Sequence, residues 1–351
     1  MVTTKTPTPS ADREIVLVSA SDNGYAMPLA VTIRSALDCL AADRRIRLYL
    51  LDGGLSDESK RRLLASWSDP RLNVEWISAD LQLVRDLKIS EHINTVTYLR
   101  LLMPWVLPPH VSRAIYADAD MLVRRNLGDL WDEPQGDHAA LAVQDVAAPW
   151  IDAPHSLPNF ERCKQHLCAW TPVANYRELG VPQDAKYLNG GMLVVNVDAW
   201  RRERYAENML ACLREHKEHI LWWDQYALNA VLAGKWRALD LRWNQGAHIY
   251  AYPNSQSSPF DRETFRQLRR KPWIIHFCSP SKPWHYFCRH PFARDWQRSL
   301  RRTDWHAWQP EKPEQFLSQL WDYHYRPIRS EWKRHVRALK QTVRSKFRKA
   351  A

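Results

Sequence analysis

The stretch AIYADAD, from Ala114 to Asp120, is a short apolar run followed by two carboxylates one residue apart. The run predicts a buried strand over Ala114–Ala117, with Asp118 and Asp120 directly after its end. Carboxylates at positions i and i+2 reach one cation where the backbone turns, and their hard oxygen atoms suit Mg²⁺ or Mn²⁺. Taken alone, the stretch also fits a solvated strand end.

Similar apolar runs lie on both sides of this stretch. The predicted strands cover Glu14–Ala20, Ile46–Leu51, Val74–Ile77, Ala139–Val143 and Met192–Val197. Helices are predicted between them at Leu29–Leu40, from Ser56 onward and over Asn94–Val106. This alternation predicts an α/β protein with an open, mostly parallel sheet, whose ligand site lies beyond the carboxyl ends of the strands. Residues 149–186 and 251–262 lack periodicity and predict long loops.

The composition is that of a globular protein of enzyme size. The 351 residues are 45% hydrophobic and 25% charged, enough to bury one large core or two modest ones. No apolar stretch approaches the ~18 residues of a membrane-spanning helix, and the polar start lacks the apolar core of a signal peptide. The six cysteines include no CxxC pair, so we expect reduced thiols in a cytoplasmic protein.

The positive charge gathers at the end of the chain. Residues 326–351 hold ten Lys or Arg and one acid, which leaves only +2 of the net charge of +11 for the rest. Apolar residues recur every three or four positions from Trp332 to Phe347 and predict a basic amphipathic helix. We expect it to bind an anionic membrane surface; the alternative is that it packs on the protein itself. No recognition module accompanies the charge, so no nucleic-acid partner is expected.

The two carboxylates also fit a second chemistry. Asp118 and Asp120 could be the nucleophile and acid of a HAD-like phosphatase that passes through an aspartyl-phosphate. The nucleophile strand of such an enzyme normally opens its domain, whereas about three predicted strands precede this one. Leu122 also occupies a position where a hydroxyl or β-branched residue is common. We rank this alternative second.

Seven segments, in order along the chain, carry a family resemblance. They are SASDNGYAMPLAVTIRSAL from Ser19, LDGGLSDESKRRL from Leu51, TYLRLLMPWVLP from Thr97, YADADMLVRRNLGDLW from Tyr116, YLNGGMLVVNVDAWR from Tyr187, WDQYALNAVLAGKW from Trp223 and IIHFCSPSKPW from Ile274. Together they resemble glycosyltransferase family 8, the retaining bacterial lipopolysaccharide and lipooligosaccharide hexosyltransferases. The resemblance implies a GT-A-like fold, a Rossmann-related open mixed sheet flanked by helices. It divides the chain into a polar leader (1–13), a nucleotide-sugar-dependent transferase domain (14–295) and a Trp-rich, basic amphipathic tail (296–351).

The resemblance also implies a role for each matching residue. Asp118, Asp120 and His276 would bind Mn²⁺ or Mg²⁺. Further contacts to a UDP-hexose would come from Ser21, Asp22, Asn23, Arg100, Ala119, Asp145, Asn189, Gly190, Gly191, Ser279 and Lys282. The catalytic residues would be Asp224, Gln225 and Lys282.

The resemblance assigns the nucleotide contacts, and the chemistry of each side chain suits the role that it implies. Asp22 and Asn23 would bind the imide edge of uracil or the ribose, and the guanidinium of Arg100 would bind phosphate and sugar oxygens. Lys282 would balance the charge that develops on the leaving diphosphate. Two positions depart from the family: Ser21 stands where some relatives have another acid, and Ser279 where many have glycine.

The predicted sugar contacts centre on Gln225, which the resemblance places against the anomeric carbon. An amide is a poor nucleophile, so we predict transfer on one face of the sugar, with the Gln225 carbonyl oxygen stabilising positive charge. Asp145, Asn189 and Asp224 would hold sugar hydroxyls. The resemblance thus predicts transfer of galactose or glucose to a glycolipid or oligosaccharide acceptor, such as lipopolysaccharide core, at the inner face of the plasma membrane. A non-catalytic sugar-nucleotide-binding protein is the remaining alternative.

Overall fold

The computed structural model describes residues 13–78, 80–87, 95–317 and 320–321. The chain divides into two compact units, the first made of residues 1–279 and 298–307 and the second of residues 280–297 and 308–351. Residues 1–12 of the predicted leader and the predicted helix from Trp332 to Phe347 lie outside the described residues. In the part of the chain that is described, no helix has the length and apolar character needed to span a bilayer.

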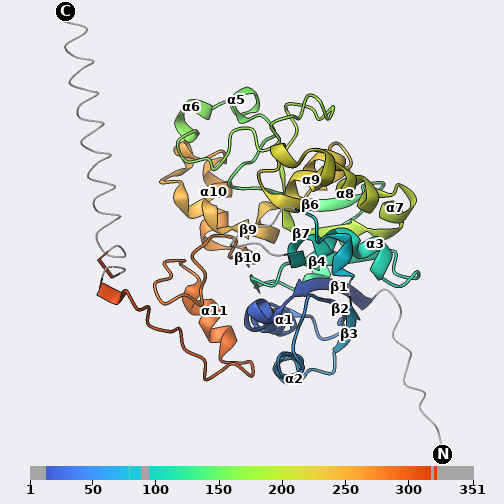
Figure 1. Cartoon of the computed structure of the whole chain (residues 1–351). Helices are drawn as coiled ribbons and strands as arrows, with labels where there is room; N and C mark the ends of the chain where they lie inside the picture. The colour runs from blue at the N-terminus through green and yellow to red at the C-terminus, as the bar shows by residue number, and fades with distance from the viewer. Residues whose placement is uncertain (1–12, 79, 88–94, 318–319, 322–351) are drawn as a thin grey trace, which may run out of the picture. The chain divides into compact units, whose positions relative to one another are not determined.

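Two sheets form the framework of the first unit (Figure 1). The strands of the main sheet are β1 (Glu14–Ser21), β2 (Arg45–Asp52), β3 (Leu72–Ser78), β4 (Arg113–Ala117), β6 (Ala140–Gln144), β7 (Leu188–Asn196) and β8 (Trp236–Ala238). The small sheet consists of β5 (Met121–Val123), β9 (Gln245–Gly246) and β10 (Ile274–His276). All six predicted strands are present, with ends shifted by a few residues. They are the strand before the two carboxylates, three strands that precede it and two that follow it.

The strand order of the main sheet is β3-β2-β1-β4-β7-β6-β8. β1 pairs in parallel with both β2 and β4, β2 with β3, and β6 with β8, whereas β7 runs antiparallel to β4 and β6. The prediction of an open, mixed and mostly parallel sheet is therefore confirmed. From β1, the strands β2 and β3 continue to one side of the sheet, whereas β4 lies on the other side of β1. The order in which strands are added to the sheet therefore changes direction at β1. In open α/β sheets, ligands bind beyond the carboxyl ends of the strands at such a point.

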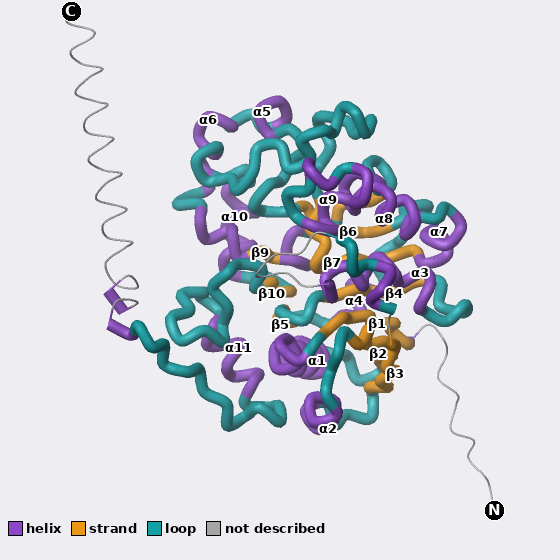
Figure 2. The backbone as a smooth tube through the Cα atoms, viewed as in Figure 1, coloured by secondary structure: helices purple, strands orange, loops and turns teal. Residues whose placement is uncertain are grey.

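Helices lie on both sides of these strands (Figure 2). The α-helices are α1 (Ala26–Cys39), α2 (Asp57–Ser66), α3 (Met103–Val106), α4 (Leu127–Trp131), α5 (Ala153–Ser156), α6 (Phe160–Cys163), α7 (Val197–Arg202), α8 (Tyr205–Glu215), α9 (Trp223–Val231), α10 (Arg262–Arg270) and α11 (Ala293–Leu300). The 3-10 helices are η2 (Asn23–Tyr25), η3 (Leu81–Leu83), η4 (Thr95–Leu102), η5 (Lys217–His219), η6 (Leu241–Asn244), η7 (Ala247–Ala251) and η8 (Ser255–Ser257). Ser56 caps α2 as predicted, since its side chain accepts a hydrogen bond from the Ser59 N–H.

Two predictions of local structure need correction. The single helix expected over Asn94–Val106 is instead the 3-10 helix η4 followed by the one-turn α3. Pro104 lies in the first turn of α3 and has no N–H to donate back to the turn before, so a continuous α-helix cannot pass through it. The strand expected from Met192 begins at Leu188, which places Gly190 and Gly191 inside β7.

Candidate active site

The link between β4 and β5 presents the two carboxylates. β4 ends just before Asp118, and β5 begins just after Asp120. Thr32 of α1 holds the link: its hydroxyl lies 2.7 Å from the Ala119 carbonyl oxygen and accepts a 3.0 Å hydrogen bond from the Met121 N–H. A buried hydroxyl with backbone partners on both sides of Asp120 fixes the direction in which the carboxylates point.

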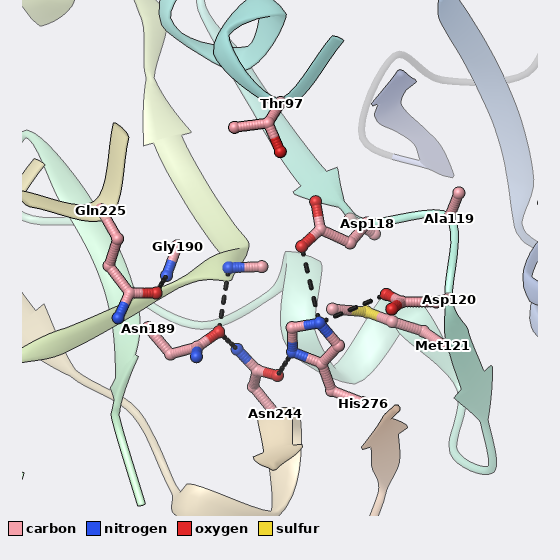
Figure 3. A network of polar contacts seen from close by, with 12 residues as sticks. Thr97, Asp118, Ala119, Asp120, Met121, Asn189, Gly190, Gln225, Asn244 and His276 are labelled. Carbon is pink, nitrogen blue, oxygen red and sulfur yellow. Dashed lines mark hydrogen bonds and ion pairs between the residues drawn. The ribbon is translucent and has the colours of Figure 1, made fainter. Parts of the chain in front are cut away.

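Asp118, Asp120 and His276 come together from distant parts of the sequence. His276 ends β10, which pairs antiparallel with β5 so that His276 lies opposite Met121. Its Nε2 lies 3.5 Å from Asp118 Oδ2 and 3.3 Å from Asp120 Oδ1 (Figure 3). One donor atom from each of the three residues lies within 4.8 Å of the others. Two carboxylate oxygens and an imidazole nitrogen fit a divalent cation such as Mn²⁺ and leave positions for substrate oxygens.

Arg100 connects Asp224 on α9 to the cluster of Asp118, Asp120 and His276, the predicted metal cluster. Its Nη2 lies 3.2 Å from Asp118 Oδ1, and its Nε lies 2.9 Å from Asp224 Oδ2. Its Nη1 donates to the Gly190 carbonyl oxygen, and the guanidinium stacks 4.8 Å from the centre of the Tyr116 ring. Burial alone would lower the pKa of Arg100, but the carboxylates of Asp118 and Asp224 raise it above its ordinary value. Arg100 is therefore a buried, permanently charged group in the site.

Asp224 is a buried acid with an unusual titration. Burial raises its pKa, Arg100 lowers it and the charge of Asp118 raises it, with a net pKa of about 6. Although Oδ2 lies 2.9 Å from Arg100 Nε, it accepts no hydrogen bond from the residues that the structure describes. A buried acceptor of this kind is suited to a hydroxyl donor from a ligand.

Gln225 follows Asp224 on α9, and its amide is held at both ends. Oε1 accepts a 3.0 Å hydrogen bond from the Gly190 N–H, and Nε2 donates to Asp145 Oδ2 over 3.2 Å. α9 begins at Trp223, whose φ of 40° lies in the left-handed region and costs a bulky residue on the order of 1–3 kcal/mol. This strained residue comes directly before the two predicted catalytic residues of α9.

Asp145 follows β6 and accepts four hydrogen bonds. Its Oδ1 accepts from the N–H groups of Ala147 (2.6 Å) and Ala148 (3.1 Å). Its Oδ2 accepts from Asn189 Nδ2 (2.7 Å) and Gln225 Nε2 (3.2 Å). The carboxylate therefore positions two amide side chains; its predicted direct contact with a sugar hydroxyl stays a prediction.

The glycine pair of β7 makes room for protein side chains. A Cβ atom at Gly191 would lie 2.3 Å from His276 Cε1 and 2.8 Å from Asp118 Oδ2, closer than real Cβ atoms approach. A Cβ atom at Gly190 would lie 3.4 Å from Arg100 Nη1. The metal cluster itself thus requires glycine at position 191. The expected approach of these glycines to a hexose stays a prediction.

The predicted uridine contacts lie at the end of β1, beside the end of β4. Ser21 is buried. Asp22 accepts a hydrogen bond from the Tyr25 N–H, and Asn23 Oδ1 accepts one from the Ser56 N–H. These bonds fix the loop after β1 on the same edge of the sheet as the carboxylates. The roles of the three residues toward a nucleotide stay predictions.

The last predicted contacts follow β10. Ser279 ends the first segment of the first unit, and Lys282 belongs to the second unit. In that unit, Lys282 Nζ lies 5.8 Å from the centre of the Trp284 ring. Their contacts with a diphosphate stay predictions.

Two residues of the site were missed by the sequence analysis. Thr32 reads as one more residue of a helix, and Asn244, which is 2% exposed, lies in the segment LRWNQG without any motif. Asn244 is placed beside His276 by the pairing of β9 with β10, with Gly246 opposite His276. Strands of two and three residues leave no periodic signal in a sequence, so neither contact could be found there.

Comparison with known proteins decides the family. The model of glycosyl transferase family 8 matches residues 16–288. The chain belongs to this family. It is 27% identical to General stress protein A of Bacillus subtilis over 299 residues, and this alignment covers 84% of this chain and 96% of that protein. It is 21% identical over 289 residues to the lipopolysaccharide 1,3-galactosyltransferase of Salmonella typhimurium, with 81% of this chain and 77% of that protein covered.

A solved galactosyltransferase structure has the same fold. The galactosyltransferase LgtC, in complex with donor and acceptor sugar analogs, matches 87% of this chain and 99% of its own with a TM-score of 0.66 and 23% identity. The predicted GT-A-like fold is thereby confirmed. Family 8 membership makes the protein a glycosyltransferase, and the phosphatase alternative is not favoured.

Proposed function

We propose that this glycosyltransferase is a retaining hexosyltransferase that moves galactose or glucose from a UDP-sugar to a saccharide acceptor. The observation that carries the proposal is the cluster of Asp118, Asp120 and His276, whose donor atoms lie within 4.8 Å of one another. It lies where β4 ends beside β1, the edge at which open α/β sheets bind nucleotides. A bound Mn²⁺ or Mg²⁺ would neutralise charge on the diphosphate.

Charged and polar side chains would bind the nucleotide. Asp22 and Asn23 would contact the uridine, and Lys282 would contact the diphosphate. The buried charge of Arg100, paired with Asp118, supports a role in holding phosphate or sugar oxygens at the metal. Ser21, Ala119 and Ser279 would complete this part of the site.

The sugar would lie between the metal cluster and α9. Asp224 Oδ2 is a buried acceptor suited to a sugar hydroxyl, and the backbone of Gly190 and Gly191 borders the same space. Gly190 N–H occupies only one of the two acceptor positions of Gln225 Oε1, so the other can face positive charge at the anomeric carbon. Same-face transfer predicts no covalent sugar on the protein. A glycosyl-enzyme trapped on the wild-type chain would refute it.

The acceptor would be a glycolipid or oligosaccharide, such as lipopolysaccharide core or another cell-envelope glycan. The relative in Salmonella typhimurium, whose name states a lipopolysaccharide galactosyltransferase, supports this choice. The basic residues from Arg326 onward would hold the enzyme on the anionic inner face of the plasma membrane, where lipid-linked acceptors are found.

The test is a screen of UDP-sugars for release of UDP, with and without Mn²⁺ and with a chelator as control. We expect one UDP-hexose to give metal-dependent UDP release that Asp120→Asn and His276→Gln abolish. Release of phosphate without any UDP would favour the phosphatase alternative. Tight binding of UDP-sugar without slow hydrolysis or transfer would favour a non-catalytic binding protein.

A further inference from the structure

Asn244 lies between the metal cluster and the residues proposed to hold the sugar. It ends η6, directly before β9, and is 2% exposed. Its Oδ1 lies 3.0 Å from His276 Nδ1, and its Nδ2 lies 2.8 Å from Asn189 Oδ1 (Figure 3). One short side chain therefore contacts a predicted metal ligand on one side and a predicted sugar contact on the other.

The direction of these hydrogen bonds is fixed by Asp145, because a carboxylate only accepts. Asp145 Oδ2 lies 2.7 Å from Asn189 Nδ2 and 3.2 Å from Gln225 Nε2, so both amides must turn their nitrogen atoms toward it. The oxygen atoms of the two amides then face away. Each meets a backbone donor there: the Gly191 N–H lies 3.0 Å from Asn189 Oδ1, and the Gly190 N–H lies 3.0 Å from Gln225 Oε1.

The orientation of Asn189 then sets that of Asn244. Since Asn189 Oδ1 is an acceptor that already receives the Gly191 N–H, the group facing it from Asn244 must be the amide NH₂. The carbonyl oxygen of Asn244 is left to face His276. With the Asn244 amide flipped, its oxygen would lie against Asn189 Oδ1, so two acceptors would face each other in a buried space.

The orientation of Asn244 finally sets the tautomer of His276. An amide oxygen 3.0 Å from Nδ1 requires that nitrogen to carry a proton. In the neutral imidazole, Nε2 then has the free electron pair, and Nε2 is the atom that lies 3.3 Å from Asp120 Oδ1 and 3.5 Å from Asp118 Oδ2. The electron pair therefore points at the position between the two carboxylates where a cation would bind.

We propose that Asn244 is a positioning residue that keeps His276 in the Nδ1–H form, with Nε2 ready for the cation, and that joins the metal cluster to Asp145 and Gln225 through Asn189. This inference rests on the metal site of the proposed function. Residues that hydrogen-bond to a metal-binding histidine commonly change metal affinity ten- to hundredfold when they are replaced.

The first test measures Mn²⁺ affinity of the full chain by the signal of free Mn²⁺ in electron paramagnetic resonance. Asn244→Ala should weaken binding by ten- to hundredfold. Asn244→Asp still offers an oxygen to His276 Nδ1 but sets a carboxylate against Asn189 Oδ1, so it should recover most of the affinity while remaining destabilised. Equal affinity of Asn244→Ala and wild type, or no better binding by Asn244→Asp than by Asn244→Ala, would overturn the inference.

A matched control separates positioning from simple loss of a buried amide. Asn175 is also a buried asparagine, and its Oδ1 accepts a 2.7 Å hydrogen bond from the hydroxyl of Tyr226, which is not one of the predicted metal ligands. Asn175→Ala should lower the melting temperature and leave Mn²⁺ affinity at the wild-type value. A comparable loss of affinity in Asn175→Ala would show that Asn244 acts only through stability.

The second test needs no variant of Asn244 and so does not depend on its folding. In ¹⁵N-histidine-labelled wild-type protein without metal, at about pH 9 where an ordinary imidazole is neutral, the His276 signals should be those of the Nδ1–H tautomer. They are assigned by their absence in His276→Gln. An Nε2–H pattern would refute the inference.

The proposed metal site and the role of Asn244 can be refuted separately. If His276→Gln binds Mn²⁺ as tightly as wild type, the proposed metal site is wrong. If His276→Gln loses affinity while Asn244→Ala keeps it, the metal site stands and only the role of Asn244 is refuted.

Discussion

Replacing Gly191 by alanine tests the geometry of the metal cluster directly. The added Cβ would lie 2.3 Å from His276 Cε1, whereas real Cβ atoms essentially never come within 3.0 Å, so the imidazole must move by about 0.7 Å. The same Cβ would lie 2.8 Å from Asp118 Oδ2 and push that carboxylate as well. Metal–ligand distances tolerate only about 0.2 Å. We expect Mn²⁺ affinity to fall ten- to hundredfold or more and metal-dependent UDP release to fall with it.

The added methyl also costs stability, so the control must share that cost without touching the site. Overpacking of this kind destabilises by about 1–3 kcal/mol. Gly234 has a φ of 71°, and a Cβ added there would meet no atom within 4 Å. Gly234→Ala therefore destabilises the fold through backbone strain of about 1–3 kcal/mol and adds no contact. Gly234 is also distant in sequence from Asp118, Asp120 and His276. Urea unfolding should show both variants destabilised, with Mn²⁺ affinity lost only in Gly191→Ala. Wild-type affinity in Gly191→Ala would refute the placement of His276 against β7.

Three further predictions address other parts of the molecule. The pKa of Asp224 is about 6 in the folded state, against an ordinary value of 3.8, so the folded state binds this proton more tightly than the unfolded state does. The free energy of unfolding therefore falls as the pH rises from about 4 to 6. Asp224→Asn should remove up to about 3 kcal/mol of that fall, as measured by urea titrations at each pH. Thr32→Val leaves the Ala119 carbonyl and the Met121 N–H without their shared hydroxyl and should cost about 1–3 kcal/mol, with weaker Mn²⁺ binding, by the same assays. Deleting the residues after Arg326 should lower co-sedimentation with anionic liposomes and leave hydrolysis of the UDP-sugar unchanged; equal sedimentation would remove the membrane proposal.

The main sheet could be predicted because its strands are long apolar runs. β1 and β2 have eight residues each, and each is separated from the next strand by a helix, which is the pattern of a parallel sheet. The start of β7 at Leu188 was missed, because Asn189 and two glycines precede the apolar run from Met192. Glycine weakens a strand, and it is tolerated here because side chains from other elements pack against the bare backbone.

The site was predicted in part, and the limit lies in its smallest strands. The carboxylates of Asp118 and Asp120 follow an apolar strand and could be found from that pattern alone. His276 and Gln225 were found only through the family resemblance, since a lone histidine or glutamine has no spacing to the acids. Asn244 and Thr32 were not found at all. Their roles depend on β5, β9 and β10, three strands of two or three residues whose pairing only the folded chain reveals.

The three residues Asn189, Gly190 and Gly191 explain why the two halves of the site cannot move independently. Asn189 uses its side chain toward Asn244 and Asp145, while Gly190 uses its N–H toward Gln225 and its carbonyl toward Arg100. Gly191 accepts a 2.8 Å hydrogen bond from the Asp118 N–H. One stretch of β7 thus holds the metal carboxylate through its backbone and the predicted sugar residues through its neighbours. Under the proposed function, a shift of this stretch, which the main sheet resists on both sides, would change the distance between the cation and the anomeric carbon. A difference of about 1 Å there is enough to slow transfer on the order of a hundredfold.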